Sequence, residues 1–190
     1  MYISNFPTGI YIGKNKINLL FRRPFPHFAW SFLYRTYLFT KYAIFYPIGR
    51  SYEDYATTYK VFSFANKVVS TDQRLYEYIQ RDSSIMHSQN ISQAMDILIA
   101  TQEIDNFFNL EDSQLKKVVY MYQLPRLLNA YGISLKSKVK NTELTAKIKG
   151  LILKKISIIG FSSFSKRDVI KILLIKLNLL GYLYRIKKMI

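Results

Sequence analysis

Several residue types that mark common kinds of functional site are scarce or absent in this sequence. There is no cysteine among the 190 residues, which excludes disulfide bridges, thiolate nucleophiles and thiolate metal sites. Neither of the two histidines, His27 and His87, has a histidine, cysteine or aspartate partner at metal-ligand spacing. Proline is nearly missing from the second half, where only Pro125 occurs. That half is therefore expected to be helical.

Acidic residues are also few, and their distribution divides the chain. The sequence contains 28 Lys and Arg against 12 Asp and Glu, a net charge of +16. Residues 1–110 carry 11 basic and 8 acidic side chains, whereas residues 111–190 carry 17 and 4. The first half also alternates aromatic runs with Pro and Gly. We therefore expect an α/β (mixed) region over residues 1–90 and a mainly helical, basic region over residues 91–190.

Long uninterrupted apolar runs are missing as well. The stretch IKILLIKLNLLGYLY is interrupted by Lys176 and bounded by Lys171 and Arg185, which argues against a transmembrane helix. The N-terminus shows no basic region followed by an apolar run, so a signal peptide is not expected. A cytoplasmic protein is the resulting prediction.

The first half is expected to hold one clear helix among shorter elements. The segment YEDYATTYKVFSFAN places Tyr55, Tyr59 and Phe62 on one side at helical spacing. The segment WSFLYRTYLF also favours a helix, and INLLF suits either a short strand or a helix start. Two short strands, KVVST and RLYEYIQ, are predicted on either side of the turn-forming Asp72.

From Ser92 onward the pattern predicts helices, one of which Pro125 kinks or splits. Two basic helices are expected after Ile133. Basic or polar residues recur every seven positions and should share a helix face opposite Ile and Leu; the two sets are Lys140, Lys147 and Lys154, and Lys171, Asn178 and Arg185. Such a face can be a solvated surface or can attach peripherally to an anionic membrane. Nucleic-acid binding is not expected, because no nucleic-acid-binding motif accompanies the charge.

Two adjacent acids, Glu53 and Asp54, open the predicted helix in the segment GRSYEDYATTYK. One interpretation is structural: Ser51 and Asp54 form an S-x-x-D capping box, with both acids favoured near the positive end of the helix dipole. The other is that one acid serves the helix end while the other is a catalytic base. Arg50 is expected to pair with Glu53.

Residues 28–88 resemble the acceptor-side half of bacterial family-2 glycosyltransferases. The resemblance rests on an aromatic segment containing Trp30, then FYPIGRSYED, then RLYEYIQRDSSI, in the family's order and at similar separation. It implies a partial GT-A-like lobe followed by a helical tail. It also implies an inverting transfer of a sugar from a nucleotide-sugar donor to a growing surface or capsular glycan.

The resemblance assigns roles to particular residues. Asp54 matches the family's general base, which takes the proton of the acceptor hydroxyl, and Glu53 supports it. Trp30 could stack on an acceptor sugar, or could equally be a core residue. The remaining assignments are the donor diphosphate contacts Arg81 and Ser84, alternatively residues of a solvated turn, and a donor-metal contact from His87.

The family's donor-binding features are not found in this sequence. Members bind the nucleotide sugar with Mn or Mg through an Asp-x-Asp motif in a preceding doubly wound half, and this chain has no Asp-x-Asp. A complete enzyme is therefore expected to need a divalent metal and a separate N-terminal half, and no cofactor is expected for this chain alone. Expected partners are a glycan or lipid-linked acceptor and an anionic surface at the inner face of the plasma membrane. The alternative is a non-catalytic, membrane-peripheral or partner-binding remnant.

Overall fold

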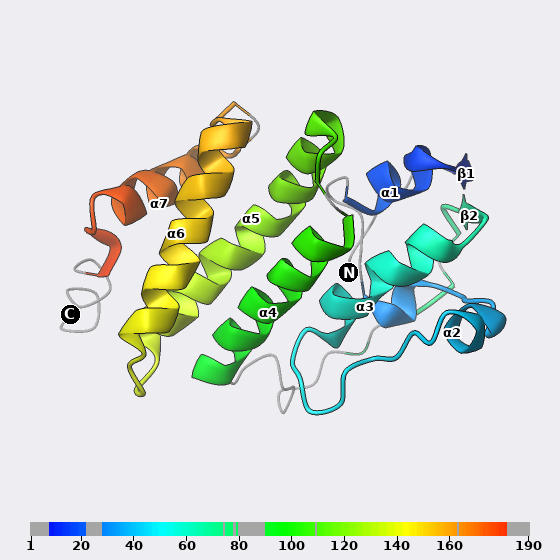
Figure 1. The fold of residues 1–190 in the computed structure, drawn as a ribbon, viewed down its shortest axis with the longest axis horizontal. Coiled ribbons are helices and arrows are strands. Elements are labelled where there is room, and N and C mark those ends of the chain that lie inside the picture. Colours follow the sequence, from blue (N-terminus) through cyan, green and yellow to red (C-terminus); the bar gives the residue numbers. More distant parts are fainter. Residues whose placement is uncertain are drawn as a thin grey trace.

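The computed structural model describes residues 8–21, 28–73, 75–77, 79, 90–108, 110–162 and 164–181. Within these ranges the fold is mixed but mostly helical, which confirms the coarse expectation of a mixed class with a helical second half (Figure 1). The elements follow in chain order: β1 (Gly9–Ile12), α1 (Lys14–Phe21), the 3₁₀ turn η1 (Ala29–Ser31), α2 (Tyr37–Lys41), α3 (Glu53–Phe64), β2 (Lys67–Ser70), α4 (Ile91–Phe108), α5 (Ser113–Lys136), α6 (Thr142–Ile159) and α7 (Lys166–Lys176).

The described sheet consists of two strands. β1 and β2 pair antiparallel, with Ile10 opposite Val69 and Ile12 opposite Lys67. Because side chains alternate across a strand, Ile10, Ile12 and Val69 share one face, and all three are exposed. The prediction that KVVST forms a strand is therefore confirmed, but its partner is β1.

The predicted second strand, RLYEYIQ, is not formed in its described residues 75–77 and 79. Leu75, Tyr76 and Ile79 are exposed, so this segment lacks the half-buried surface that a strand needs. The expectation of a second strand after Asp72 was therefore wrong for the residues that the structure describes. Likewise, only residues 37–41 of the segment WSFLYRTYLF and its continuation are α-helical, preceded by η1 and an irregular stretch.

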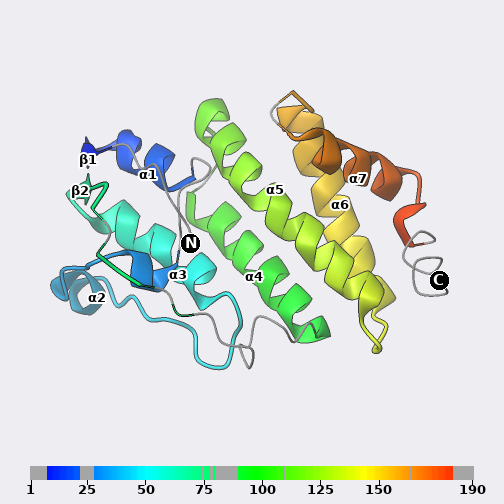
Figure 2. The same ribbon diagram turned by 180° about the vertical axis from the view of Figure 1, so that it is seen from behind.

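The helices of the second half lie in a row. α4, α5 and α6 pack side by side, joined by short connections, and α7 packs against α5 and α6 at one end of the molecule (Figures 1 and 2). Short connections impose antiparallel neighbours. α3 and α1 pack on the opposite side of the row, against α4 and α5 respectively.

The main hydrophobic core includes residues from both sides of position 90. Tyr55, Tyr59 and Phe62 of α3 are buried in it, which confirms the predicted apolar face of this helix. The same cluster contains Ile97 of α4, Leu124 of α5, and side chains of α6 and α7. A smaller cluster, Leu38, Ile44 and Val61, lies under α2. α3 is therefore held by packing on several sides.

α5 is not split by its proline. It runs from Ser113 to Lys136 with Pro125 inside it. Asp112 caps its start, accepting hydrogen bonds from the backbone N–H groups of Gln114 and Leu115. Packing on four other helices stabilises α5 along its length and offsets the hydrogen bond that a proline removes.

The two basic helices are present as α6 and α7, but the seven-residue spacing does not describe them. Lys140 lies before α6 and donates to the carbonyl of Leu135 at 2.6 Å. Asn178 lies beyond α7 with a φ of 58°, and Arg185 is outside the described residues. Only Lys147 and Lys154 share a helix face as expected. Among the described helices, none has the length and apolar character needed to cross a membrane.

A buried ion pair joins α6 to α4. The Nζ of Lys155 lies 2.6 Å from Oδ2 of Asp105, and the lysine side chain is 1% exposed. The Asp105 carboxylate also accepts a hydrogen bond from Nε2 of Gln123 on α5 at 2.9 Å. The ring of Tyr120 lies 3.8 Å from the ammonium. Three helices thus share one polar contact inside an otherwise apolar interface.

Candidate functional site

The site is built around Asp54, the second residue of α3. The helix starts at Glu53, one residue later than a Ser51 cap predicts, and the predicted capping box is not formed. Tyr52 occupies the N-cap position in a left-handed conformation, with a φ of 59°, and no side chain caps the helix. The Ser51 backbone N–H instead donates to Oδ2 of Asp96 on α4 at 2.9 Å.

A second contact with α4 holds the same turn. Arg50 forms an ion pair with Glu103, with Nη1 to Oε1 at 2.8 Å, so the expected pair with Glu53 was wrong. The carboxylates of Asp96 and Glu103 fix residues 50 and 51 from the neighbouring helix. The sequence places these partners 45 and 53 residues away, beyond the reach of a local pattern.

The far end of α3 is fixed as well. Lys16 of α1 is buried, and its Nζ donates to the backbone carbonyls of Ser63 and Ala65. A cation at a helix C-terminus satisfies exposed carbonyls and opposes the negative end of the helix dipole. α3 therefore presents Asp54 from a backbone held at both ends.

The Asp54 carboxyl group is half-buried, and its acidity is weakened. The pKa of Asp54 is raised to about 6; burial is the largest cause, and the charge of Glu53 acts in the same direction. The hydrogen bond from the Tyr55 backbone N–H to Oδ1, at 2.6 Å, and the charge of Arg126 act in the opposite direction. The burial effect prevails. At neutral pH the carboxyl group is mainly ionised, yet it binds a proton more readily than an ordinary aspartate.

Three tyrosines lie close enough to this carboxyl group to feel its charge. Burial raises the pKa of the phenols of Tyr34, Tyr46 and Tyr52, and the negative charge of Asp54 adds to each shift. The hydroxyls of Tyr34 and Tyr46 are near each other and near Thr58, but neither oxygen has a hydrogen-bond partner at ordinary geometry in the described chain. All three phenols stay protonated at neutral pH and can act as hydrogen-bond donors.

Arg126 supplies the positive charge of the site, and the sequence interpretation overlooked it. Its guanidinium lies 3.9 Å from the ring centroid of Tyr122 and 4.7 Å from that of Tyr55, and Nη1 donates to the carbonyl of Tyr122 at 2.8 Å. Residues 118–135 contain no other charged side chain. A single cation in an apolar stretch of a helix indicates a specific partner, and this signal could have identified it.

The other predicted site residues are only partly described. Glu53 is exposed beside Asp54. Trp30 is 38% exposed and stacked on the rings of Phe28 and Tyr76, with centroid separations of 5.0 and 4.7 Å. A sugar that stacks on Trp30 has to compete with these rings. The predicted contacts Arg81, Ser84 and His87 lie outside the described residues.

The described part of the site does not fit a divalent metal. Among the described residues, no group of three or more His, Cys, Asp or Glu side chains lies close enough together to hold one. Asp54 is a single carboxylate near a guanidinium and phenols, whereas Mg²⁺ and Mn²⁺ take several oxygen ligands without a competing cation.

Comparison of the chain with models of protein families, with curated proteins and with solved structures finds no match.

Proposed function

We propose that this chain is the acceptor-side portion of a family-2 glycosyltransferase of the GT-A type, in which Asp54 is the general base. The observation that carries the proposal is a partly exposed carboxylate with a pKa raised to about 6, on a helix start held by two side chains of α4. It coincides with the YED sequence on which the family resemblance rests. A base works best when its pKa lies near the operating pH.

The proposed reaction is an inverting sugar transfer. The Asp54 carboxylate accepts the proton of the acceptor hydroxyl as that oxygen attacks the anomeric carbon, and the bond to the nucleotide diphosphate breaks. A single carboxylate suffices because the diphosphate is already a good leaving group. Glu53 favours proton uptake by Asp54 through its charge.

The donor side of the reaction is proposed to come from a separate N-terminal half. That half would carry the Asp-x-Asp motif, the divalent metal and the nucleotide-sugar pocket. Several exposed apolar side chains of the first half of this chain support association with a covering surface: Ile10, Ile12, Leu33, Phe45, Ile48 and Val69. Arg81 and Ser84 remain the predicted contacts to the diphosphate, and His87 a predicted contact to the metal.

The test combines the chain with a donor-binding half and measures transfer of labelled sugar to a lipid-linked glycan. Asp54→Asn should lower turnover roughly 10² to 10⁴-fold, the usual contribution of a positioned base, with little change in donor affinity. Glu53→Gln is the matched control, since it removes the adjacent carboxylate and should cost much less. Wild-type turnover of Asp54→Asn would disprove the assigned role.

The second candidate function is a non-catalytic, partner-binding or membrane-peripheral remnant of such an enzyme. The same exposed apolar side chains favour it, because apolar side chains on the surface can bind a partner protein without any catalysis. Calorimetry of the chain with nucleotide sugars and manganese, with and without the donor-binding half, separates the two functions. Saturable nucleotide binding only in the combined sample favours the enzyme, and its absence in both favours the remnant.

A further inference from the structure

The outer surface of α7 carries apolar side chains where a helix normally presents polar ones. Ile172 and Ile175 are buried and attach α7 to the core. Ile170, Leu173 and Leu177 point away from the core and are 57%, 43% and 62% exposed. Their spacing of three and then four residues places them along one side of the helix and its last turn.

Cations border this apolar strip. Lys166, Arg167 and Lys176 are exposed, and Lys171 is half-buried. The one acid of the helix, Asp168, is engaged at the helix start, where it accepts a hydrogen bond from the Ser165 hydroxyl at 2.8 Å. The surface is thus apolar at its centre and positively charged around it.

The connection between α6 and α7 extends the same character. Ile158 in the last turn of α6 and Phe161 in the connection are 40% and 42% exposed, and Leu179 beyond α7 is 44% exposed. α7 lies at one end of the row of helices, where the other described helices leave its outer side uncovered (Figures 1 and 2).

We propose that the outer face of α7, comprising Ile170, Leu173 and Leu177 with Lys166, Arg167 and Lys171, is a docking surface for an anionic lipid membrane. A helix with an apolar strip bordered by Lys and Arg lies in the membrane plane: its apolar side chains enter the headgroup region and its cations contact acidic headgroups. A second copy of the chain is a poorer occupant, because two such faces would bring like charges together. The inference does not depend on the proposed transferase activity.

Co-sedimentation of the full chain with lipid vesicles tests this surface. The vesicles contain phosphatidylcholine with about 30% phosphatidylglycerol, and pure phosphatidylcholine vesicles serve as the neutral reference. The chain should bind the anionic vesicles, and the binding should weaken several-fold when the salt concentration rises from about 0.05 M to about 0.5 M, because salt screens the attraction. Equal binding to neutral vesicles would overturn the charge-based proposal.

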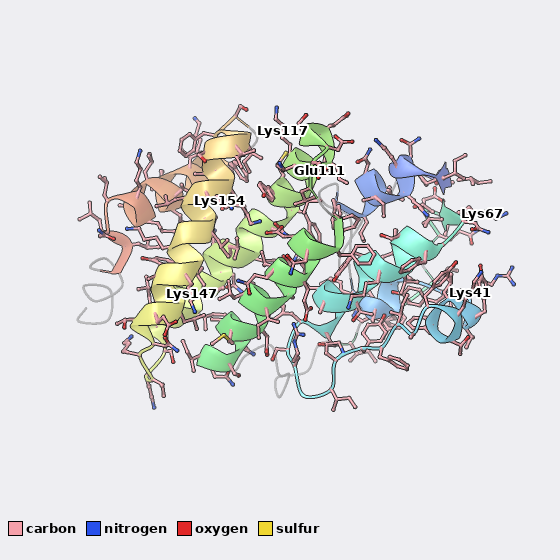
Figure 3. The ribbon with its side chains drawn as sticks, viewed as in Figure 1. Lys41, Lys67, Glu111, Lys117, Lys147 and Lys154 are labelled. Atoms are coloured by element: carbon pink, nitrogen blue, oxygen red, sulfur yellow. The ribbon has the colours of Figure 1, made fainter. Side chains whose placement is uncertain are left out.

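Two pairs of double variants locate the surface. Lys166→Gln with Arg167→Gln should weaken binding about tenfold or more. The control, Lys41→Gln with Lys67→Gln, removes the same charge from the other end of the molecule, where Figure 3 shows both lysines far from α7, and should change little. Ile170→Gln with Leu173→Gln should also weaken binding, whereas Leu33→Gln with Ile48→Gln, at side chains 99% and 100% exposed, should not.

Circular dichroism establishes that each variant is folded, which is expected because every substituted side chain lies largely outside the core. Equal losses in the α7 variants and their controls would mean that total charge or total apolar surface drives binding, and would overturn the assignment to α7. Size-exclusion chromatography tests for self-association. If the parent chain forms dimers and does not bind vesicles, and the double variant Ile170→Gln with Leu173→Gln is monomeric, a second copy of the chain occupies the face instead.

Discussion

The ammonium of Lys155 on α6 lies 2.6 Å from the Asp105 carboxylate on α4, with the lysine almost fully buried. Burial lowers the pKa of Lys155, and the neighbouring carboxylate opposes that change. The two partners differ in exposure, since the Asp105 side chain is 25% exposed and the lysine 1%. Loss of one partner should therefore affect folding differently from loss of the other.

Asp105→Ala should destabilise the protein more than Lys155→Met. The first substitution leaves a buried ammonium without its counter-charge, at a cost of about 3 to 5 kcal/mol. The second leaves a partly hydrated carboxylate that still accepts the Gln123 hydrogen bond, so about 0 to 2 kcal/mol is expected. Urea unfolding followed by circular dichroism measures both. A larger loss of stability for Lys155→Met would contradict this explanation. It would show that the attraction within the ion pair, and not the burial of an uncompensated ammonium, determines the loss.

Two glycines of α6 should respond in opposite directions to alanine. Gly150 lies in the helix interior with open space around it, and Gly150→Ala should stabilise by about 0.5 to 1 kcal/mol. Gly160 follows the helix with a φ of 72° and a ψ of −172°, a conformation confined almost entirely to glycine. Gly160→Ala should destabilise by roughly 1 to 3 kcal/mol. Thermal unfolding of the two variants compares them, and a shift in the same direction would contradict the backbone geometry at Gly160.

Asp54→Asn should stabilise the folded chain at neutral pH. The pKa of Asp54 is about 6 in the folded chain, which exceeds the value in the unfolded chain. Protonation of Asp54 therefore stabilises the folded state: the full contribution is present below about pH 4 and is lost as the pH rises through 6. The asparagine carries no charge and avoids this loss. We expect a gain of about 1 to 3 kcal/mol at pH 7.5 that disappears near pH 3.5. Urea unfolding at both values measures it, and a gain independent of pH would point to a different cause.

Local patterns predicted the elements that depend on local residues. The buried face of α3 follows from the spacing of Tyr55, Tyr59 and Phe62, and α4 and α5 follow from long periodic segments with few breakers. Pro125 was expected to kink or split its helix because propensity weighs against it. Burial of α5 against its neighbours outweighs that local preference.

The contacts that build the site could not be predicted in the same way. Ser51 was an obvious cap, but its backbone is held by Asp96, and Arg50 pairs with Glu103 instead of the adjacent Glu53. These partners come from another helix, and a sequence window contains no information on which face of that helix turns toward them. Asp54 was identified by its motif, whereas its raised pKa depends on burial that only the fold provides.

The pKa of Asp54 can be measured in the chain alone, by nuclear magnetic resonance of its side-chain carboxyl carbon across a pH titration. The wild type should titrate near pH 6. Glu53→Gln should lower the pKa of Asp54 because it removes a nearby negative charge, and Arg126→Met should raise it because it removes the nearby positive charge while still filling space against Tyr122. Lys14→Met is the matched control: it also removes a cation, but one that is paired with Asp112 at the start of α5, so the pKa of Asp54 should stay where it is. Titration of Asp54 near pH 4 in all four proteins would mean that water reaches the carboxylate freely, and a base of that strength would be poorly matched to proton removal at neutral pH.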